Sequence, residues 1–351
     1  MASVSAVLTP GTRVCVTGAT GFIALHLVEQ LLNRGYEVNA AIRGGTQKKL
    51  EPLQSLQNKY QDKLNITTGC DLLKPGSFHA AVEGCHTVFH TASPFWMDDR
   101  ITDPIKQLVE PAEQGTLNVL ESCDKNDVRR VVVTSSFAAI MNVGGNNPWS
   151  DTFQYSEEHW NTSSKPNSEN VFPNPPNGHA YRWSKTVAEQ AAWNFDSKSF
   201  NVSTILPPMV LGVNKQNLSS IDDLNQSSLI LYKLLAGEMP FSMPGSVGFV
   251  DVSDVAKAHV LAAESEVAVG ERYLCSGETT TWIEVCKLLQ ELFPEFAERI
   301  PTTCADGSTE QPCLLLKNDK LKRDLNMEFV PLRDTLFAQG KSLIDAGLLH
   351  K

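Results

Sequence analysis

Long apolar runs and positive charge are both scarce in this sequence. No uninterrupted apolar stretch approaches the roughly 18–20 residues that span a lipid bilayer. The chain has 30 lysines and arginines against 40 aspartates and glutamates, which gives a formal net charge of −10. Proteins that bind nucleic acid or anionic membrane surfaces carry a basic face instead. We therefore expect no nucleic-acid partner and no membrane association.

Signals for export and for metal binding are lacking as well. The first ten residues have neither the basic region nor the long apolar core of a secretory signal, so we expect a cytoplasmic protein. The eight cysteines show no metal-ligand spacing, and no metal site is predicted. In a reducing compartment these cysteines are not expected to form a disulfide framework.

Strand and helix signals alternate regularly through the first half of the chain. The 351 residues are 42% apolar and 20% charged, which is typical of a globular protein with a large core. Short runs rich in valine and isoleucine predict strands at 13–17, 37–42, 64–69, 86–91 and 130–135. Helical patterns between them predict helices at about 21–34, 46–60, 76–82 and 104–125. The alternation predicts an α/β fold, namely a Rossmann-type doubly wound parallel sheet with helices on both faces.

The pattern changes in the second half. Residues 143–179 are dense in Gly, Asn, Pro and Ser, and they predict an irregular excursion over the surface. This segment is expected either to form a wall or lid of a site or to be a plain surface insertion. A helix over 181–197 and a strand over 202–206 then resume the α/β pattern. From Gly212 onward, loops and helices predict a smaller C-terminal lobe.

A glycine-rich turn follows the first predicted strand. Gly18, Gly21 and Ala24 form a GxxGxxA pattern where that strand leads into a helix. The glycines allow a tight turn and a close approach of the backbone to a phosphate, and the alanine lets the helix pack on the strand. A helix N-terminus at this place can bind the pyrophosphate of a dinucleotide. The sequence therefore predicts a dinucleotide site that includes Gly18 and Gly21.

The end of the second strand indicates which dinucleotide is bound. A chain that binds NAD would place Asp or Glu there for the ribose 2′-hydroxyl, but residues 39–43 (NAAIR) contain no carboxylate and none follows before Glu51. Arg43 stands at this strand end and can form a bidentate contact with a 2′-phosphate, and Lys48 can add a positive charge nearby. A solvated arginine at a strand end is the alternative explanation. We predict NADP(H) as the cofactor.

Turns after the third and fourth strands are expected beside the same cofactor. Asp71 and the amide of Leu72 can lie near the adenine, although Asp71 could instead cap its own turn. His90, which ends the fourth strand, is expected to be a packed histidine rather than an acid or base. The backbone that follows it is expected to flank the cofactor through Thr91, Ala92 and Ser93.

A phenol and an amine lie four residues apart, at Tyr181 and Lys185, and therefore share one face of a helix. Carbonyl reduction needs a hydride and a proton donor. A phenol with its ordinary pKa of ~10 donates poorly at neutral pH, so a neighbouring cation that lowers this pKa would help. Ser136, at the end of the fifth strand, can orient the substrate oxygen, with Ser135 as the alternative. We predict Ser136, Tyr181 and Lys185 as the catalytic residues, and Tyr181 and Lys185 also as cofactor contacts.

At these residues the sequence resembles the extended short-chain dehydrogenase/reductases. Within them it is similar to the branch that holds dihydroflavonol 4-reductases, cinnamoyl-CoA reductases and yeast-type methylglyoxal or aldehyde reductases. The resemblance covers nearly the whole chain. It is carried by residues 16–24, 88–94, 132–136, 155–160 and, most specifically, 181–193 (YRWSKTVAEQAAW).

The resemblance implies the same catalytic trio and a set of cofactor contacts. Those contacts fall on Phe22, Ile23, Arg43, Lys48, Asp71, Leu72, Pro207 and Val210. One departure concerns the substrate. The Asn-Trp-Tyr-Cys-Tyr element of cinnamoyl-CoA reductases is missing, and residues 178–182 (GHAYR) stand in its place. Coenzyme A thioesters are therefore not expected as substrates, and the differing substrate loops do not imply a flavonoid.

Together these features predict an NADPH-dependent reductase that converts a small-molecule aldehyde or ketone reversibly to an alcohol, as a monomer or homodimer. Two alternatives stay open. An NAD-retaining nucleotide-sugar epimerase or dehydratase would use the same fold and trio, but Arg43 argues against it. A non-catalytic NADP-binding regulator would not need the intact trio.

A hydrophobic pocket is expected from Trp96, Met97, Phe137 and apolar residues of 226–245, for each of which core packing is an equal explanation.

The chain is expected to divide into two parts. An NADP-binding Rossmann domain would comprise residues 1–211, and residues 248–270 would return to it. A substrate-binding lobe would be formed by 212–247 and 271–351.

Overall fold

The computed structural model describes residues 7–93, 101–143, 153–173 and 176–350. Within these residues a seven-stranded sheet has the order β10-β7-β5-β4-β1-β2-β3, and all of its pairs are parallel. The strand order reverses between β1 and β4. In open parallel sheets, ligands bind at such a reversal, beyond the carboxyl ends of the strands.

Six of the seven strands lie close to their predicted positions, β10 is not predicted, and all except the edge strand β3 are mostly buried. Buried central strands of this kind need apolar side chains on both faces, which explains the valine-rich runs in the sequence. Their bounds are β1 Arg13–Thr17, β2 Glu37–Ala41, β3 Leu64–Thr67, β4 Thr87–His90, β5 Arg130–Thr134, β7 Asn201–Leu206 and β10 Arg272–Leu274.

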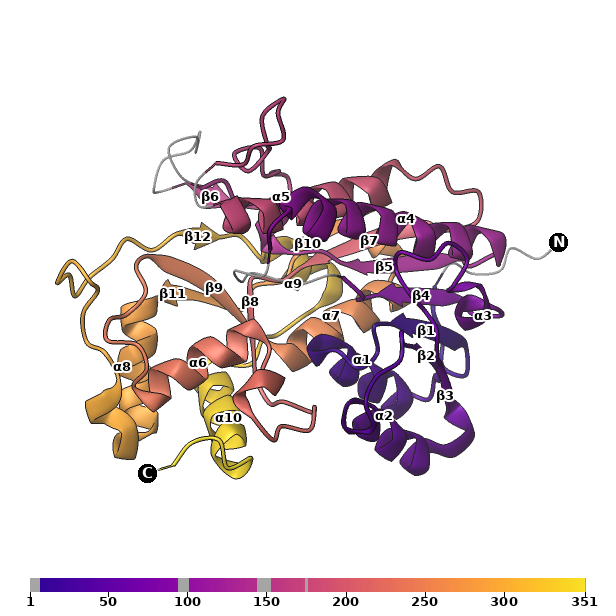
Figure 1. The fold of residues 1–351 in the computed structure, drawn as a ribbon. Coiled ribbons are helices and arrows are strands. Elements are labelled where there is room, and N and C mark those ends of the chain that lie inside the picture. The colour runs from indigo at the N-terminus through magenta and orange to yellow at the C-terminus, as the bar shows by residue number, and fades with distance from the viewer. Residues whose placement is uncertain (1–6, 94–100, 144–152, 174–175, 351) are drawn as a thin grey trace.

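Helices cover both faces of this sheet (Figure 1). On one face α1 (Phe22–Asn33) packs against α7 (Val252–Glu264), and on the other α4 (Glu110–Lys125) packs against α5 (Pro176–Asn194). The remaining helices of this part are α2 (Gln47–Tyr60) and the short α3 (His79–Val82). The predicted α/β class and Rossmann-type doubly wound sheet are confirmed. No helix of the described chain is long and apolar enough to cross a bilayer.

A smaller lobe with its own apolar core lies beside the main sheet (Figure 1). It is built on a three-stranded sheet of order β11-β9-β8. Its elements are β8 Met209–Leu211, α6 Gln226–Ala236, β9 Ser246–Asp251, β11 Glu278–Thr281, α8 Trp282–Leu292 and α10 Leu332–Asp345. Between them on the chain, β10 pairs with β7 of the main sheet, and α9 (Asp319–Leu325) packs near β10.

Three strands fall outside the parts predicted for them. Strands β8 and β9 pair within the small sheet, although residues up to 211 and residues 248–270 are predicted in the main domain. Strand β10 belongs to the main sheet, although the lobe is predicted to resume at 271. The reason is connectivity. The chain passes through the small sheet once, returns by α7 and adds one more parallel strand before it leaves again. We therefore propose the same two-part division with these three strands reassigned.

The expected surface excursion over 143–179 is wrong for residues 155–164, half of which are buried, whereas residues 165–171 are largely exposed. Strand β6 (Gln154–Tyr155) pairs with β12 (Leu315–Leu316). The side chain of Asn161 donates to the Ala138 carbonyl at 3.1 Å, and the side-chain oxygen of Asn142 accepts from the Thr162 amide at 2.8 Å. Side chains thus satisfy the backbone of an irregular segment and hold it against the turn after β5. Residues 144–152, 174 and 175 lie outside the described residues.

Candidate active site

The turn after β1 forms a cradle that fits a dinucleotide pyrophosphate. Gly18 has φ +64°, and a Cβ there would lie 2.9 Å from the Cα of Ala92. Gly21 precedes α1, which has no side-chain cap and no acidic residue in its first turn. The first amides of this helix, from Phe22 and Ile23 onward, therefore stay available for an anion at the positive end of the helix dipole.

Thr17 holds the ends of β1 and β4 together. Its hydroxyl accepts from the Ala92 amide at 3.1 Å and hydrogen-bonds Nδ1 of His90 at 3.0 Å, and Thr91 donates to the Thr17 carbonyl. Burial lowers the pKa of His90 to about 4, so this ring is neutral at physiological pH. His90 is thus a packed histidine, and the network brings Thr91 and Ala92 beside Gly18.

The two cations expected to bind the 2′-phosphate have different surroundings. Arg43 is exposed just beyond β2 and forms no ion pair within the described residues. Lys48 lies in the first turn of α2, and its ammonium group already contacts the carboxylate of Asp223 and the hydroxyl of Ser219. The contact with Lys48 holds the pKa of Asp223 well below its usual range. Arg43 fits the expected role directly, whereas Lys48 is shared with another segment of the chain.

The turn after β3 has structural contacts of its own. The carboxylate of Asp71 accepts from the Leu73 amide at 3.0 Å, which is the turn-capping alternative. Leu72 lies against α4, where a Cβ on Gly115 would come within 2.9 Å of it, and the Asn118 side chain donates to the Leu72 carbonyl at 2.7 Å. An adenine contact by Asp71 or Leu72 stays a prediction.

The three predicted catalytic residues lie together at the carboxyl end of β5. The side chain of Ser136 lies within hydrogen-bonding reach of the Tyr181 hydroxyl. Lys185, one helical turn after Tyr181 on α5, lies with its ammonium 5.8 Å from the centroid of the tyrosine ring. The same ammonium donates to the hydroxyl of Ser93 at 2.8 Å, which ties the catalytic helix to the loop after β4.

Burial governs the protonation of both α5 groups. Burial raises the pKa of Tyr181 to about 12, and the hydrogen bond from Ser136 only partly opposes this rise. Desolvation lowers the pKa of Lys185 to about 8. The sequence led us to expect that the lysine lowers the phenol pKa. Burial raises this pKa instead, and the opposing contributions come from Ser136 and Arg182.

Neighbouring serines at the end of β5 face different partners. Ser135 is 6% exposed, and its hydroxyl donates to Glu189 at 2.7 Å. Ser136 contacts Tyr181 and also accepts from the Ala138 amide at 3.1 Å. Successive residues of extended chain point to opposite sides, so only one of the two can face the tyrosine. This geometry supports Ser136 as the catalytic serine.

A buried ion pair behind the trio escaped the sequence analysis. Glu189 is 1% exposed and accepts from Arg272 Nε at 2.8 Å and from Thr204 Oγ1 at 2.8 Å. Arg272 stacks on Trp160, with its guanidinium carbon 3.6 Å from the ring centroid. The available signal was a carboxylate four residues after Lys185 on the buried face of one helix. Its partner lies 83 positions away, and sequence spacing does not indicate it.

Two further predicted cofactor contacts, Pro207 and Val210, and the predicted pocket residue Phe137 lie in different surroundings. The carbonyl of Pro207 accepts from the Phe137 amide at 2.9 Å, so it lies beside the turn that carries Ser136. Val210 pairs with Val250 in the small sheet. Phe137 is 4% exposed and meets Tyr155 edge-on at 5.4 Å, which favours core packing over pocket lining.

For residues 226–245 the buried leucines of α6 likewise belong to the core of the small lobe. The remaining pocket candidates, Trp96 and Met97, lie outside the described residues.

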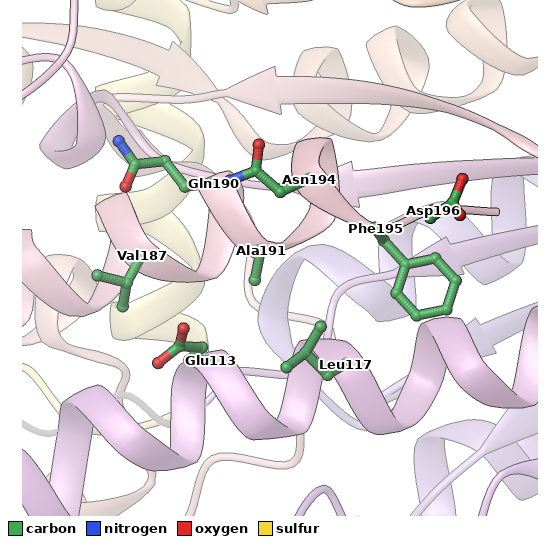
Figure 2. Close-up of a pocket in the computed structure, with 8 residues that line it drawn as sticks. All are labelled: Glu113, Leu117, Val187, Gln190, Ala191, Asn194, Phe195 and Asp196. Atoms are coloured by element: carbon green, nitrogen blue, oxygen red, sulfur yellow. The ribbon is translucent and has the colours of Figure 1, made fainter.

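Two cavities lie near α5. A small one at the ends of β4 and β5 is lined by, among others, Ser93, Ser135, Lys185 and Glu189. A larger hollow of about 390 Å³ opens between α4 and α5. Figure 2 shows Glu113 and Leu117 of α4 pointing toward Val187 and Ala191 of α5. None of the predicted site residues lines this hollow, so size alone does not locate the active site.

Residues 14–276 match the NAD dependent epimerase/dehydratase family. The chain belongs to this family. A cinnamoyl-CoA reductase of Medicago truncatula is 37% identical over 336 residues, 95% of this chain and 96% of that protein. Tetraketide alpha-pyrone reductase 1 of Arabidopsis thaliana is 36% identical over 286 residues, 80% of this chain and 81% of that protein.

Solved structures agree with these relatives. Yeast methylglyoxal/isovaleraldehyde reductase, crystallised in complex with NADPH, matches with a TM-score of 0.81 at 31% identity and covers 96% of this chain and 100% of that one. The resemblance to extended short-chain dehydrogenase/reductases is therefore confirmed, including the branch of cinnamoyl-CoA reductases and yeast-type methylglyoxal reductases.

Proposed function

We propose that this protein is an NADPH-dependent oxidoreductase that reduces an aldehyde or ketone reversibly to an alcohol. The single observation that carries the proposal is the cluster at the end of β5. There Ser136 lies within hydrogen-bonding reach of the Tyr181 hydroxyl, and Lys185 lies one turn further along the helix that carries Tyr181. The relatives named as reductases and the NADPH complex of the yeast enzyme support this chemistry.

The residues of the cradle fit NADPH. In this proposal Gly18, Gly21, Phe22 and Ile23 bind the pyrophosphate through the uncapped start of α1. Arg43 and Lys48 bind the 2′-phosphate, and Asp71 and Leu72 lie near the adenine. The remaining contacts come from the loop after β4, from α5 and from the segment after β7, through Thr91, Ala92, Ser93, Tyr181, Lys185, Pro207 and Val210. NADPH supplies the hydride that reduces the carbonyl carbon.

The side chains of the chain handle the proton. The Tyr181 hydroxyl donates its proton to the oxygen of the reduced carbonyl. Because the pKa of this phenol is about 12, the hydroxyl is protonated at neutral pH before the transfer. The Ser136 hydroxyl donates a hydrogen bond to the same oxygen and orients it. Lys185, with a pKa of about 8, is mostly protonated at pH 7 and stabilises the phenolate left after transfer.

A free carbonyl is proposed as the substrate rather than a coenzyme A thioester, because GHAYR replaces the expected element at 178–182. His179 of this stretch is 3% exposed and hydrogen-bonds the Ser164 hydroxyl at 3.0 Å. The His179 side chain therefore packs in the protein interior. The specific carbonyl compound is to be found by experiment.

The test compares wild type with Tyr181→Phe on a panel of aldehydes, ketones and coenzyme A thioesters, each with NADPH and with NADH. We expect wild type to consume NADPH with free carbonyls. The variant should lose nearly all turnover while its NADPH affinity, read by fluorescence titration, stays within a factor of about three. Turnover like wild type in the variant would refute the mechanism. Purified protein that carries stoichiometric NAD and is inert toward free carbonyls would instead support an epimerase or dehydratase.

A further inference from the structure

A segment of the small lobe crosses onto the helices of the proposed cofactor domain. We call residues 213–223 the strap. The carbonyl of Val213 hydrogen-bonds Nε2 of His26 on α1 at 2.9 Å, and Lys215 pairs with Glu29 of the same helix. Further along, the strap reaches α2 through the Lys48–Asp223 pair. Contacts with two successive helices place the strap beside the edge at which the 2′-phosphate of NADPH is proposed to bind.

Asp223 is held in place by the strap itself. Its Oδ2 accepts from the amides of Ser219 and Ser220, each at 3.0 Å. The carboxylate therefore caps its own turn and keeps its orientation toward Lys48. The side chains of Lys48 and Asp223 are 35% and 22% exposed, so water and a ligand can reach this pair.

The same lysine thus has two possible anionic partners. A phosphate monoester carries a charge of about −1.5 to −2 near pH 7, more than a carboxylate does. Of the two cations predicted to bind the 2′-phosphate, Arg43 forms no ion pair within the described residues and Lys48 is paired with Asp223, so a 2′-phosphate gains full use of Lys48 only by displacing Asp223. A carboxylate that stays close to the phosphate also repels it.

We propose that Asp223 is a cofactor-specificity residue, which weakens NADPH binding selectively because it competes with the 2′-phosphate for Lys48. This inference rests on the proposed use of NADPH. It also means that the strap gives up its ion pair to α2 when NADPH binds and keeps it when NADH binds, because NADH has no phosphate at this position.

Asp223→Asn is the decisive variant, because an amide oxygen can still accept from the Ser219 and Ser220 amides while the charge is removed. The neighbouring carboxylate supplies the matched control. Asp222 is exposed and forms no ion pair within the described residues, so Asp222→Asn changes the net charge equally without touching Lys48. Dissociation constants of NADPH and NADH are measured by fluorescence titration on the full chain, and thermal unfolding confirms that both variants are folded.

We expect Asp223→Asn to tighten NADPH about three- to tenfold and to leave NADH within a factor of about two. Asp222→Asn should change both cofactors by less than a factor of about two. In a Lys48→Gln background the gain from Asp223→Asn should fall to the level of the Asp222 control.

Unchanged or weaker NADPH binding in Asp223→Asn would overturn the inference, and so would equal tightening of both cofactors. A wild type that does not bind NADPH would count against the proposed function itself. The two failures are therefore distinguishable.

Discussion

Two ion pairs flank the candidate site, and they differ in burial. Glu189 and Arg272 meet behind the catalytic helix, with side chains 0% and 12% exposed. Lys48 and Asp223 meet at the opposite edge of the site, with side chains 35% and 22% exposed. A buried pair has no water to replace a lost partner, whereas a half-exposed pair does. The first pair can therefore only be structural, while the second is open to exchange with a ligand.

The buried pair also joins the most elements. Glu189 connects α5 to Thr204 on β7, to Arg272 on β10 and to Ser135 at the end of β5. These contacts position the strand end that carries Ser136 against the helix that carries Tyr181 and Lys185. The half-exposed pair connects two surface segments that each have other contacts. The comparison makes three predictions.

The largest effect is expected from Glu189→Ala, which leaves the guanidinium of Arg272 buried without its carboxylate. We expect the free energy of unfolding to fall by about 3–5 kcal/mol. Urea unfolding followed by circular dichroism measures this. The control is Gln190→Ala on the same helix, at the edge of the α4–α5 hollow, and it should cost less than about 1 kcal/mol. A small loss in Glu189→Ala would remove the distinction between the two pairs.

The second-largest effect is expected from a fall in pH, which should lower the free energy of unfolding through two buried histidines. Burial lowers the pKa of both His90 and His259 to about 4, from ordinary values near 6.5. Between these pH values the unfolded chain binds protons that the native rings do not accept. The stability contributed by each neutral ring is therefore full above pH ~6.5 and is lost as the pH falls toward 4, by up to about 3 kcal/mol per ring.

Urea unfolding at a series of pH values tests this, with His259→Gln expected to flatten the dependence. His350 is exposed, so His350→Gln should leave the pH dependence as it is in wild type. An equal slope in all three proteins would contradict the assignment to buried rings.

The smallest change in stability is expected at the half-exposed pair. Lys48→Met should alter the free energy of unfolding by less than about 1 kcal/mol. The same variant should raise the dissociation constant of NADPH roughly tenfold, because a charged contact with the phosphate is lost. Lys49 is exposed and forms no ion pair within the described residues, so Lys49→Met serves as the control for both measurements. Strong destabilisation by Lys48→Met would show that this pair is structural as well.

Much of the fold could be predicted because its signals are local. Strand β1 begins and ends as predicted, and α1 starts directly after Gly21, where the glycine-rich turn leads into the helix. The inward packing of residues 155–164 could not be predicted, because it depends on side-chain contacts such as that of Asn161 with a backbone carbonyl over 20 residues away. Irregular segments carry no period in sequence from which such contacts follow.

In the candidate site, too, some features could be predicted from the sequence and others could not. Gly18, Ser136, Tyr181 and Lys185 each follow or open a regular element, so their meeting at one edge of a parallel sheet was predictable. The direction of the Tyr181 pKa shift was not, because it depends on how deeply the phenol is buried.

The sequence by itself determined the doubly wound sheet, the glycine-rich turn and the positions of the proposed catalytic trio, since apolar periodicity and turn residues act over a few positions. Only the tertiary structure decided which charged groups meet. Arg272 lies 83 residues from Glu189, and Asp223 lies 175 residues from Lys48. The attraction between two charges depends on their separation in space and on the water around them, and the packing of distant segments sets both.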